Sequence, residues 1–125
     1  MEEKHWWQGY PWRMLQTNLR EIDMADIDAD AYAEQLKEYG ATVVTLNAAG
    51  IVASYQTQLD CQTQSPYLTG SSLHEIIDAC HKRGIRVIAR TDFSKLREGV
   101  FARHPDWAYR DKNGEVVNYN GNIQT

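Results

Sequence analysis

The sequence predicts an α/β fold in which three parallel strands alternate with two helices in the order β-α-β-α-β. Short apolar runs rich in β-branched residues alternate with segments whose apolar residues recur at helical spacing. The segments "YGATVVTLN" and "RGIRVIART" align as a repeat, in which Gly40 or Gly84 ends a helix directly before an apolar strand. Strands that are buried on both faces and joined by helices are typically parallel, so these observations indicate a parallel sheet.

The first half of this pattern covers one strand, one helix and a second strand. Residues 13–18 are the first predicted strand. Asp30 is expected to cap a helix that runs to about Tyr39 and stops at Gly40, because apolar side chains there have the spacing of one helical face. Residues 42–47 form a short apolar run that predicts a buried strand.

The second helix has the clearest start signal of the chain. Ser72 and Glu75 have the spacing of a capping box, in which each side chain accepts from a free amide of the first turn. An apolar stripe that includes Cys80 follows, and Gly84 is expected to end the helix. We therefore expect Cys80 to be a buried thiol, and we expect the third strand to begin at Arg86.

The connections that leave the predicted strands are much longer than those that enter them. A polar segment follows Asn18, and residues 48–70 separate the second strand from the second helix. In parallel α/β proteins these connections, at the carboxyl ends of the strands, build the active site. After the third strand, residues 107–110 and 115–119 are expected to pair as a hairpin across Asn113-Gly114 in a type I′ turn, forming a lid or wall beside the site.

Polar residues close all three predicted strands. They are Asn18, Asn47 and the run Arg90-Thr91-Asp92. Amides, a guanidinium and a carboxylate are suitable groups for hydrogen-bonding the hydroxyls of a sugar. An alternative stays open, in which the asparagines only form turns and Asp92 only caps the segment that starts at Ser94.

Composition excludes several classes of protein. The net charge of -4 is not that of a nucleic-acid-binding protein. No stretch approaches the roughly 20 apolar residues of a membrane span, and no apolar signal core is present near the start, so we expect a cytoplasmic protein without a membrane partner. Cys61 and Cys80 are too few for a disulfide framework.

No metal or cofactor is expected. Asp26, Asp28 and Asp30 alternate as in a calcium loop, but Ala31 and Lys37 stand where that loop needs glycine and glutamate. The sequence has no glycine-rich phosphate loop and no zinc-protease motif.

Several motifs together resemble one family. They are "LNAAGI", "SPYLTG", "LHEIIDACHKRGIRVIARTDFSKL" and "HPDWAYRDKNGEVVNYNG", which occur in this order. This set is similar to the N-terminal part of the "hypothetical glycosyl hydrolase 6" family, and the similarity extends from about Arg13 to Thr125. The helix-turn-strand segment alone is common among α/β barrels, whereas the ordered set is considerably more specific.

The resemblance implies a (β/α)₈ barrel that hydrolyses glycosidic bonds with retention, of the α-L-fucosidase or β-galactosidase type. Such barrels need about 250 residues, so residues 13–125 are interpreted as the N-terminal part of a barrel. Residues 1–12, which precede the first predicted strand, are interpreted as an N-terminal arm. The candidate sugar contacts are Asn18, Asn47, Arg90 and Asp92 at the strand ends, together with Asn118 and Asn120 of the last motif. The full-length enzyme could form a homo-oligomer.

The catalytic residues are not identifiable from this sequence. A glycosidase needs two carboxylates about 5 to 10 Å apart, and Asp92 is the best-placed acid, with Glu98 and Asp106 as weaker candidates. The resemblance implies that the catalytic pair lies on later strands. Two alternatives stay open: a non-catalytic carbohydrate-binding or regulatory α/β module, and a small flavodoxin-like domain completed by partner chains.

Overall fold

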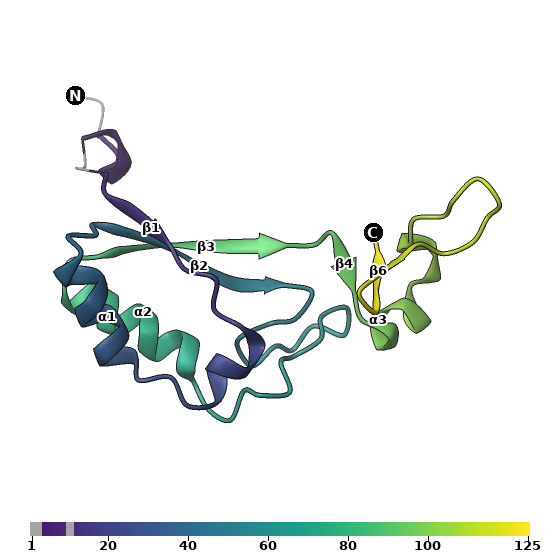
Figure 1. Ribbon diagram of the computed structural model, residues 1–125, viewed down its shortest axis with the longest axis horizontal. Helices are drawn as coiled ribbons and strands as arrows, with labels where there is room; N and C mark the ends of the chain where they lie inside the picture. The colour runs from purple at the N-terminus through teal and green to yellow at the C-terminus, as the bar shows by residue number, and fades with distance from the viewer. Residues whose placement is uncertain (1–3, 10–11) are drawn as a thin grey trace.

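A three-stranded parallel sheet with two helices on one face forms the larger part of the molecule (Figure 1). The computed structural model describes residues 4–9 and 12–125. The strand order is β1-β2-β3, and both pairings are parallel. The predicted β-α-β-α-β order is confirmed by β1 (Met14–Gln16), α1 (Ala29–Glu38), β2 (Val43–Gly50), α2 (Ser72–Lys82) and β3 (Arg86–Asp92).

The main core lies between the sheet and the two helices. Val44 and Leu46 of β2 pack against Leu36 of α1 and against Ile76 and Cys80 of α2, and all five side chains are buried. Burying one such aliphatic side chain contributes about 1.5–3 kcal/mol, so this layer provides much of the stability of the fold. The buried Cys80 thiol is confirmed, and burial raises its pKa.

Helix α1 begins earlier than predicted. The capping residue is Asp28, whose side chain accepts the backbone N–H of Ala31 at 2.9 Å, so the prediction of Asp30 as the cap is wrong. Asp30 lies in the first turn, and its carboxylate pairs with the Arg83 guanidinium at 3.0 Å. Arg83 also pairs with Glu34 at 2.8 Å, so one arginine joins the end of α2 to α1.

The capping box predicted for α2 is also wrong. Ser71, not Ser72, precedes the helix, and no side chain caps its first turn. The hydroxyl of Ser72 donates instead to the backbone carbonyl of Met24 at 2.6 Å, which anchors the first long loop to α2. Ser71 donates to the Glu75 carboxylate at 3.1 Å.

The strand ends differ from the predicted ones. Strand β1 is shorter than the predicted 13–18, whereas β2 continues to Gly50, so that Asn47 lies within the strand. The register between β2 and β3 shifts between Asn47 and Ala49. The first long loop contains the 3-10 helix η2 (Glu21–Ala25).

A smaller unit follows β3, at the carboxyl end of the parallel sheet (Figure 1). It contains an antiparallel sheet in the order β4-β6-β5 with its own core of Leu96, Val100 and Ile123. Its elements are β4 (Lys95–Leu96), α3 (Glu98–Arg103), the 3-10 helix η3 (Pro105–Trp107), β5 (Asn118–Tyr119) and β6 (Asn122–Gln124).

The hairpin predicted across Asn113-Gly114 is present but shorter than expected. Arg110 forms an isolated antiparallel bridge with Val116, while Trp107 belongs to η3 and not to a strand. The His104 and Trp107 rings stack with centroids 3.9 Å apart, which holds this end of the segment in a turn instead of an extended strand.

The type I′ turn occurs at the other Asn-Gly pair of the chain. Gly114 has a φ of 82° but Asn113 has no positive φ, because the Asp111 carboxylate accepts the Asn113 N–H at 2.8 Å and stabilises a different turn. Asn120 and Gly121 have φ values of 48° and 75°, the pair of positive values that a type I′ turn requires, and they join β5 to β6.

The N-terminal segment contains the 3-10 helix η1 (Trp6–Gln8). The Trp6 ring stacks on Trp12 with centroids 5.7 Å apart, and the Arg86 guanidinium lies 5.3 Å from the centre of the Trp6 ring. Residues 1–3, 10 and 11 of the predicted N-terminal arm lie outside the described residues. Across the described part of the chain, no helix has the length and apolar character needed to cross a membrane.

Candidate functional site

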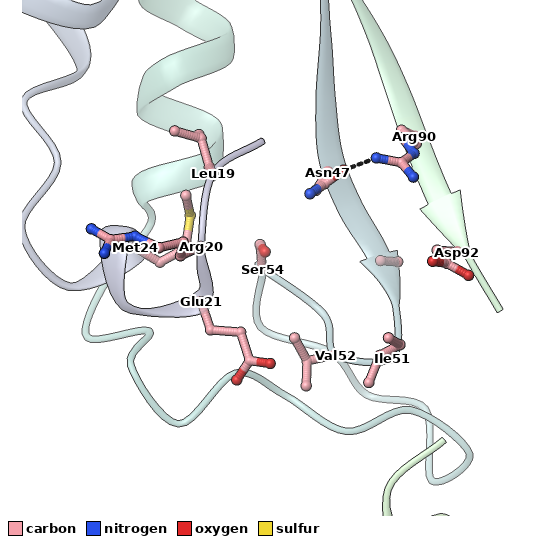
Figure 2. Close-up of a pocket in the computed structure, with 11 residues that line it drawn as sticks. Leu19, Arg20, Glu21, Met24, Asn47, Ile51, Val52, Ser54, Arg90 and Asp92 are labelled. Carbon is pink, nitrogen blue, oxygen red and sulfur yellow. Dashed lines mark hydrogen bonds between the residues drawn. The ribbon is translucent and has the colours of Figure 1, made fainter. Parts of the chain in front are cut away.

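A pocket of about 290 Å³ lies at the carboxyl ends of β2 and β3 (Figure 2). Its walls come from the loop after β1, from β2 with the loop that follows it, and from β3. Asn47, Arg90 and Asp92 all line it, so three of the predicted site residues are brought together. The other lining residues are Leu19, Arg20, Glu21, Met24, Ala49, Ile51, Val52 and Ser54.

Strand register explains why Asn47 and Arg90 lie side by side. They are direct neighbours across the β2–β3 pairing, and paired residues on parallel strands point to the same face. Leu46 and Val87 face the helices, so the alternation of the strands directs Asn47 and Arg90 to the opposite face. Arg90 Nη1 donates to Asn47 Oδ1 at 3.3 Å, as Figure 2 shows.

Gly50 allows Asp92 to approach β2 closely. The two residues are paired in register, and Gly50 has a φ of 132°, which side-chain-bearing residues rarely adopt. A Cβ atom added at Gly50 would lie 1.9 Å from the backbone oxygen of Asp92. Glycine is therefore required here, and it keeps Asp92 at the rim of the pocket.

Asp92 is held as a carboxylate. Its Oδ1 accepts the Ser94 hydroxyl at 2.6 Å and the Ser94 backbone N–H at 3.0 Å. These two bonds lower the pKa of Asp92, and the positive charges of Lys95 and Arg90 lower it further. Oδ2 accepts no hydrogen bond from the described residues and is available to a ligand.

The pocket has a second acidic residue that the sequence did not indicate. Glu21 lines the wall formed by the loop after β1, but its carboxylate pairs with the Arg97 guanidinium from the smaller unit. Figure 2 shows the Glu21 side chain extending away from Asn47 and Arg90. Asp92 is therefore the one lining acid whose carboxylate is not engaged by an arginine. No local pattern marks Glu21, because its partner is far away in the sequence.

The remaining predicted contacts lie outside this pocket. Asn18 is exposed and its Oδ1 accepts the Gln16 side-chain amide at 3.1 Å, although the next residue, Leu19, does line the pocket. Asn118 and Asn120 belong to the β5–β6 hairpin of the smaller unit.

The weaker acid candidates lie outside the pocket. Glu98 begins α3 and Asp106 lies in η3, and neither lines the pocket. Within residues 4–9 and 12–125, no cluster of three or more His, Cys, Asp or Glu side chains could hold a metal ion.

A pocket with both polar and apolar walls at the carboxyl ends of parallel strands is the arrangement by which α/β enzymes bind small ligands. The chain belongs to the hypothetical glycosyl hydrolase 6 family, which it matches over residues 28–125. The resemblance inferred from the sequence motifs is thereby confirmed over residues 28–125. No curated protein matches the sequence.

A solved structure shares the fold. The chain is similar to α-L-fucosidase isoenzyme 2 from Paenibacillus thiaminolyticus, with a TM-score of 0.71 and 19% sequence identity. The similarity covers 92% of this chain and 19% of that chain, so the present chain spans about a fifth of the fucosidase structure. At this identity the comparison shows a common fold and does not assign a substrate.

Proposed function

We propose that the pocket at the ends of β2 and β3 binds a sugar and that the chain contributes one wall of a glycoside hydrolase active site. The observation that carries this proposal is the convergence of Asn47, Arg90 and Asp92 in one pocket of a chain that belongs to a glycosyl hydrolase family. Free Asp92 Oδ2 accepts from sugar hydroxyls, while the Arg90 guanidinium donates to hydroxyl or ring oxygens.

The apolar part of the pocket fits the same ligand. Met24, Ile51 and Val52 line it beside the polar groups. Sugars have C–H-rich faces as well as hydroxyls, so a pocket with both kinds of surface matches their chemistry. Asn18 remains a candidate contact for a ligand that extends past Leu19, and Asn118 and Asn120 remain candidates for one that reaches the smaller unit.

Hydrolysis needs a pair of carboxylates, whereas Asp92 is proposed here as a sugar contact. Glu21 does not supply one of them, because its carboxylate is neutralised by Arg97. We therefore propose that the acid/base and nucleophile lie on further strands of a (β/α)₈ barrel, in a retaining enzyme of the α-L-fucosidase or β-galactosidase type. The parallel sheet with helices on one face is the arrangement from which such a barrel is built.

A second candidate is a non-catalytic carbohydrate-binding module. The specific observation in its favour is that the described pocket presents a single carboxylate that is not paired with an arginine. Sugar binding without turnover on any glycoside would support this candidate over the hydrolase.

The experiment combines an assay of the full-length protein on aryl glycosides, starting with 4-nitrophenyl α-L-fucoside and β-D-galactoside, with a binding titration of the same sugars, for wild type and Asp92→Asn. We expect the variant to lose about tenfold or more in sugar affinity, because it removes a charged acceptor. Asp78→Asn, an exposed acid on α2 outside the pocket, is the control and should behave as wild type. Equal affinity of Asp92→Asn and wild type would remove Asp92 from the site.

A further inference from the structure

The smaller unit contacts both long loops through arginines at the two ends of α3. Arg97, directly before α3, pairs with Glu21 of the loop after β1. Arg103, the last residue of α3, donates through Nη2 to the backbone carbonyl of Asp60 in the loop after β2. The segment after β3 is therefore bound to both loops at the carboxyl end of the sheet.

The pair between Arg97 and Glu21 is partly shielded from water. The side chains are 40% and 34% exposed, and Arg97 Nε is buried without a hydrogen-bond partner among the described residues. Removing Glu21 or its charge would leave a partly buried guanidinium without compensation, which is costly. The Arg97–Glu21 pair therefore contributes more to stability than a fully exposed ion pair of the same geometry.

Glu21 links this ion pair to the wall of the pocket. It is the first residue of η2, and both Glu21 and Met24 of η2 line the pocket. The inner end of η2 is held by the Ser72 hydroxyl on the Met24 carbonyl at 2.6 Å. The Arg97 pair holds the outer end, so η2 is fixed at two points, while Arg97 itself does not line the pocket.

We propose that Arg97 is a positioning residue for the sugar pocket: by holding Glu21, it keeps η2 in place as the pocket wall opposite Arg90 and Asp92. The inference rests on the proposed sugar-binding function for its consequence in affinity. It assigns a role in shaping the site to the segment after β3, none of whose residues lines the pocket.

The first experiment needs no sugar. Hydrogen exchange of the backbone amides of residues 19–25 is compared between wild type, Arg97→Met and Arg83→Met. We expect exchange about fivefold faster in Arg97→Met only. Loss of such an ion pair raises the equilibrium constant for local opening by a factor of that order. Arg83→Met is the matched control, since Arg83 pairs with Asp30 and Glu34 away from the pocket. Equal exchange of residues 19–25 in all three proteins would overturn the proposal.

The second experiment measures binding of L-fucose and D-galactose to the full-length protein. We expect affinity about fivefold weaker in Arg97→Met, partial recovery in Arg97→Lys, and recovery in the charge-swapped pair Arg97→Glu with Glu21→Arg relative to either single reversal. Affinity unchanged in Arg97→Met would overturn the positioning role. If wild type binds neither sugar, the proposed function fails, while the exchange experiment still decides whether Arg97 holds η2.

Discussion

At the level of single residues, Asp92 illustrates how a neighbour adapts a carboxylate to binding. Ser94 donates twice to one oxygen of Asp92 and leaves the other free. The lowered pKa keeps Asp92 ionised at neutral and mildly acidic pH, which suits a hydrogen-bond acceptor for sugar hydroxyls and not a general acid. The local sequence Asp-Phe-Ser already contains both partners of this interaction.

Removing the Ser94 hydroxyl should raise the pKa of Asp92 toward the usual value of 3.8, since that bond is the largest cause of the lowering. Because a protonated Asp92 is a poorer acceptor, the acid limit of sugar binding should move to higher pH in Ser94→Ala. The measurement is an NMR titration of the Asp92 carboxyl carbon. Ser54→Ala, which also lines the pocket, is the control. An unchanged Asp92 titration in Ser94→Ala would contradict the assignment.

The same interaction predicts the sign of a stability effect. The pKa of Asp92 is lowered in the folded state, so its contribution to stability is present above the unfolded value of about 4. That contribution is lost as the pH falls through the folded pKa, and Ser94→Ala reduces it.

At the level of elements, helix starts were the least predictable features. The pattern of Ser72 and Glu75 satisfies the capping rule, but the helix begins with Ser71 as its flanking residue. Ser72 instead faces the buried Met24 carbonyl, a partner supplied by a different loop. The helix itself and its apolar face were predictable, because the stripe that contains Ile76 and Cys80 depends only on local periodicity.

Ser72→Ala should lower the free energy of unfolding by about 1–2 kcal/mol, because it leaves the buried Met24 carbonyl without its donor. Ser71→Ala should cost less than about 0.5 kcal/mol, since Ser71 is exposed and makes no capping bond. Urea unfolding followed by tryptophan fluorescence compares the two. If Ser71→Ala proved the more damaging, the Ser72–Met24 hydrogen bond would not be the main side-chain contribution to stability at this helix start.

At the level of the whole molecule, both edges of the parallel sheet lack a neighbouring strand among the described residues. Strands β1 and β3 each pair on one edge only among the described strands, and both helices cover the same face (Figure 1). Trp12, Met14 and Leu15 are 47%, 53% and 36% exposed. Unpaired strand edges with exposed apolar side chains favour association.

The chain of 125 residues, produced by itself, should therefore associate as its concentration is raised. Sedimentation velocity provides the measurement. Met14→Lys should reduce association, because it places a charge beside the β1 edge on the face away from the helices. A monodisperse monomer with one cooperative thermal transition would argue against this prediction.

The sequence by itself determined the order of strands and helices, the parallel sheet, the buried Cys80 and the polar residues of β2 and β3. These features follow from periodicity and from glycine positions, which are local properties. Tertiary structure alone decided that Asp92 approaches Gly50, that Ser72 binds Met24 and that Glu21 pairs with Arg97. Each of these contacts joins residues from different elements, and no local pattern specifies which distant groups will meet when the chain folds.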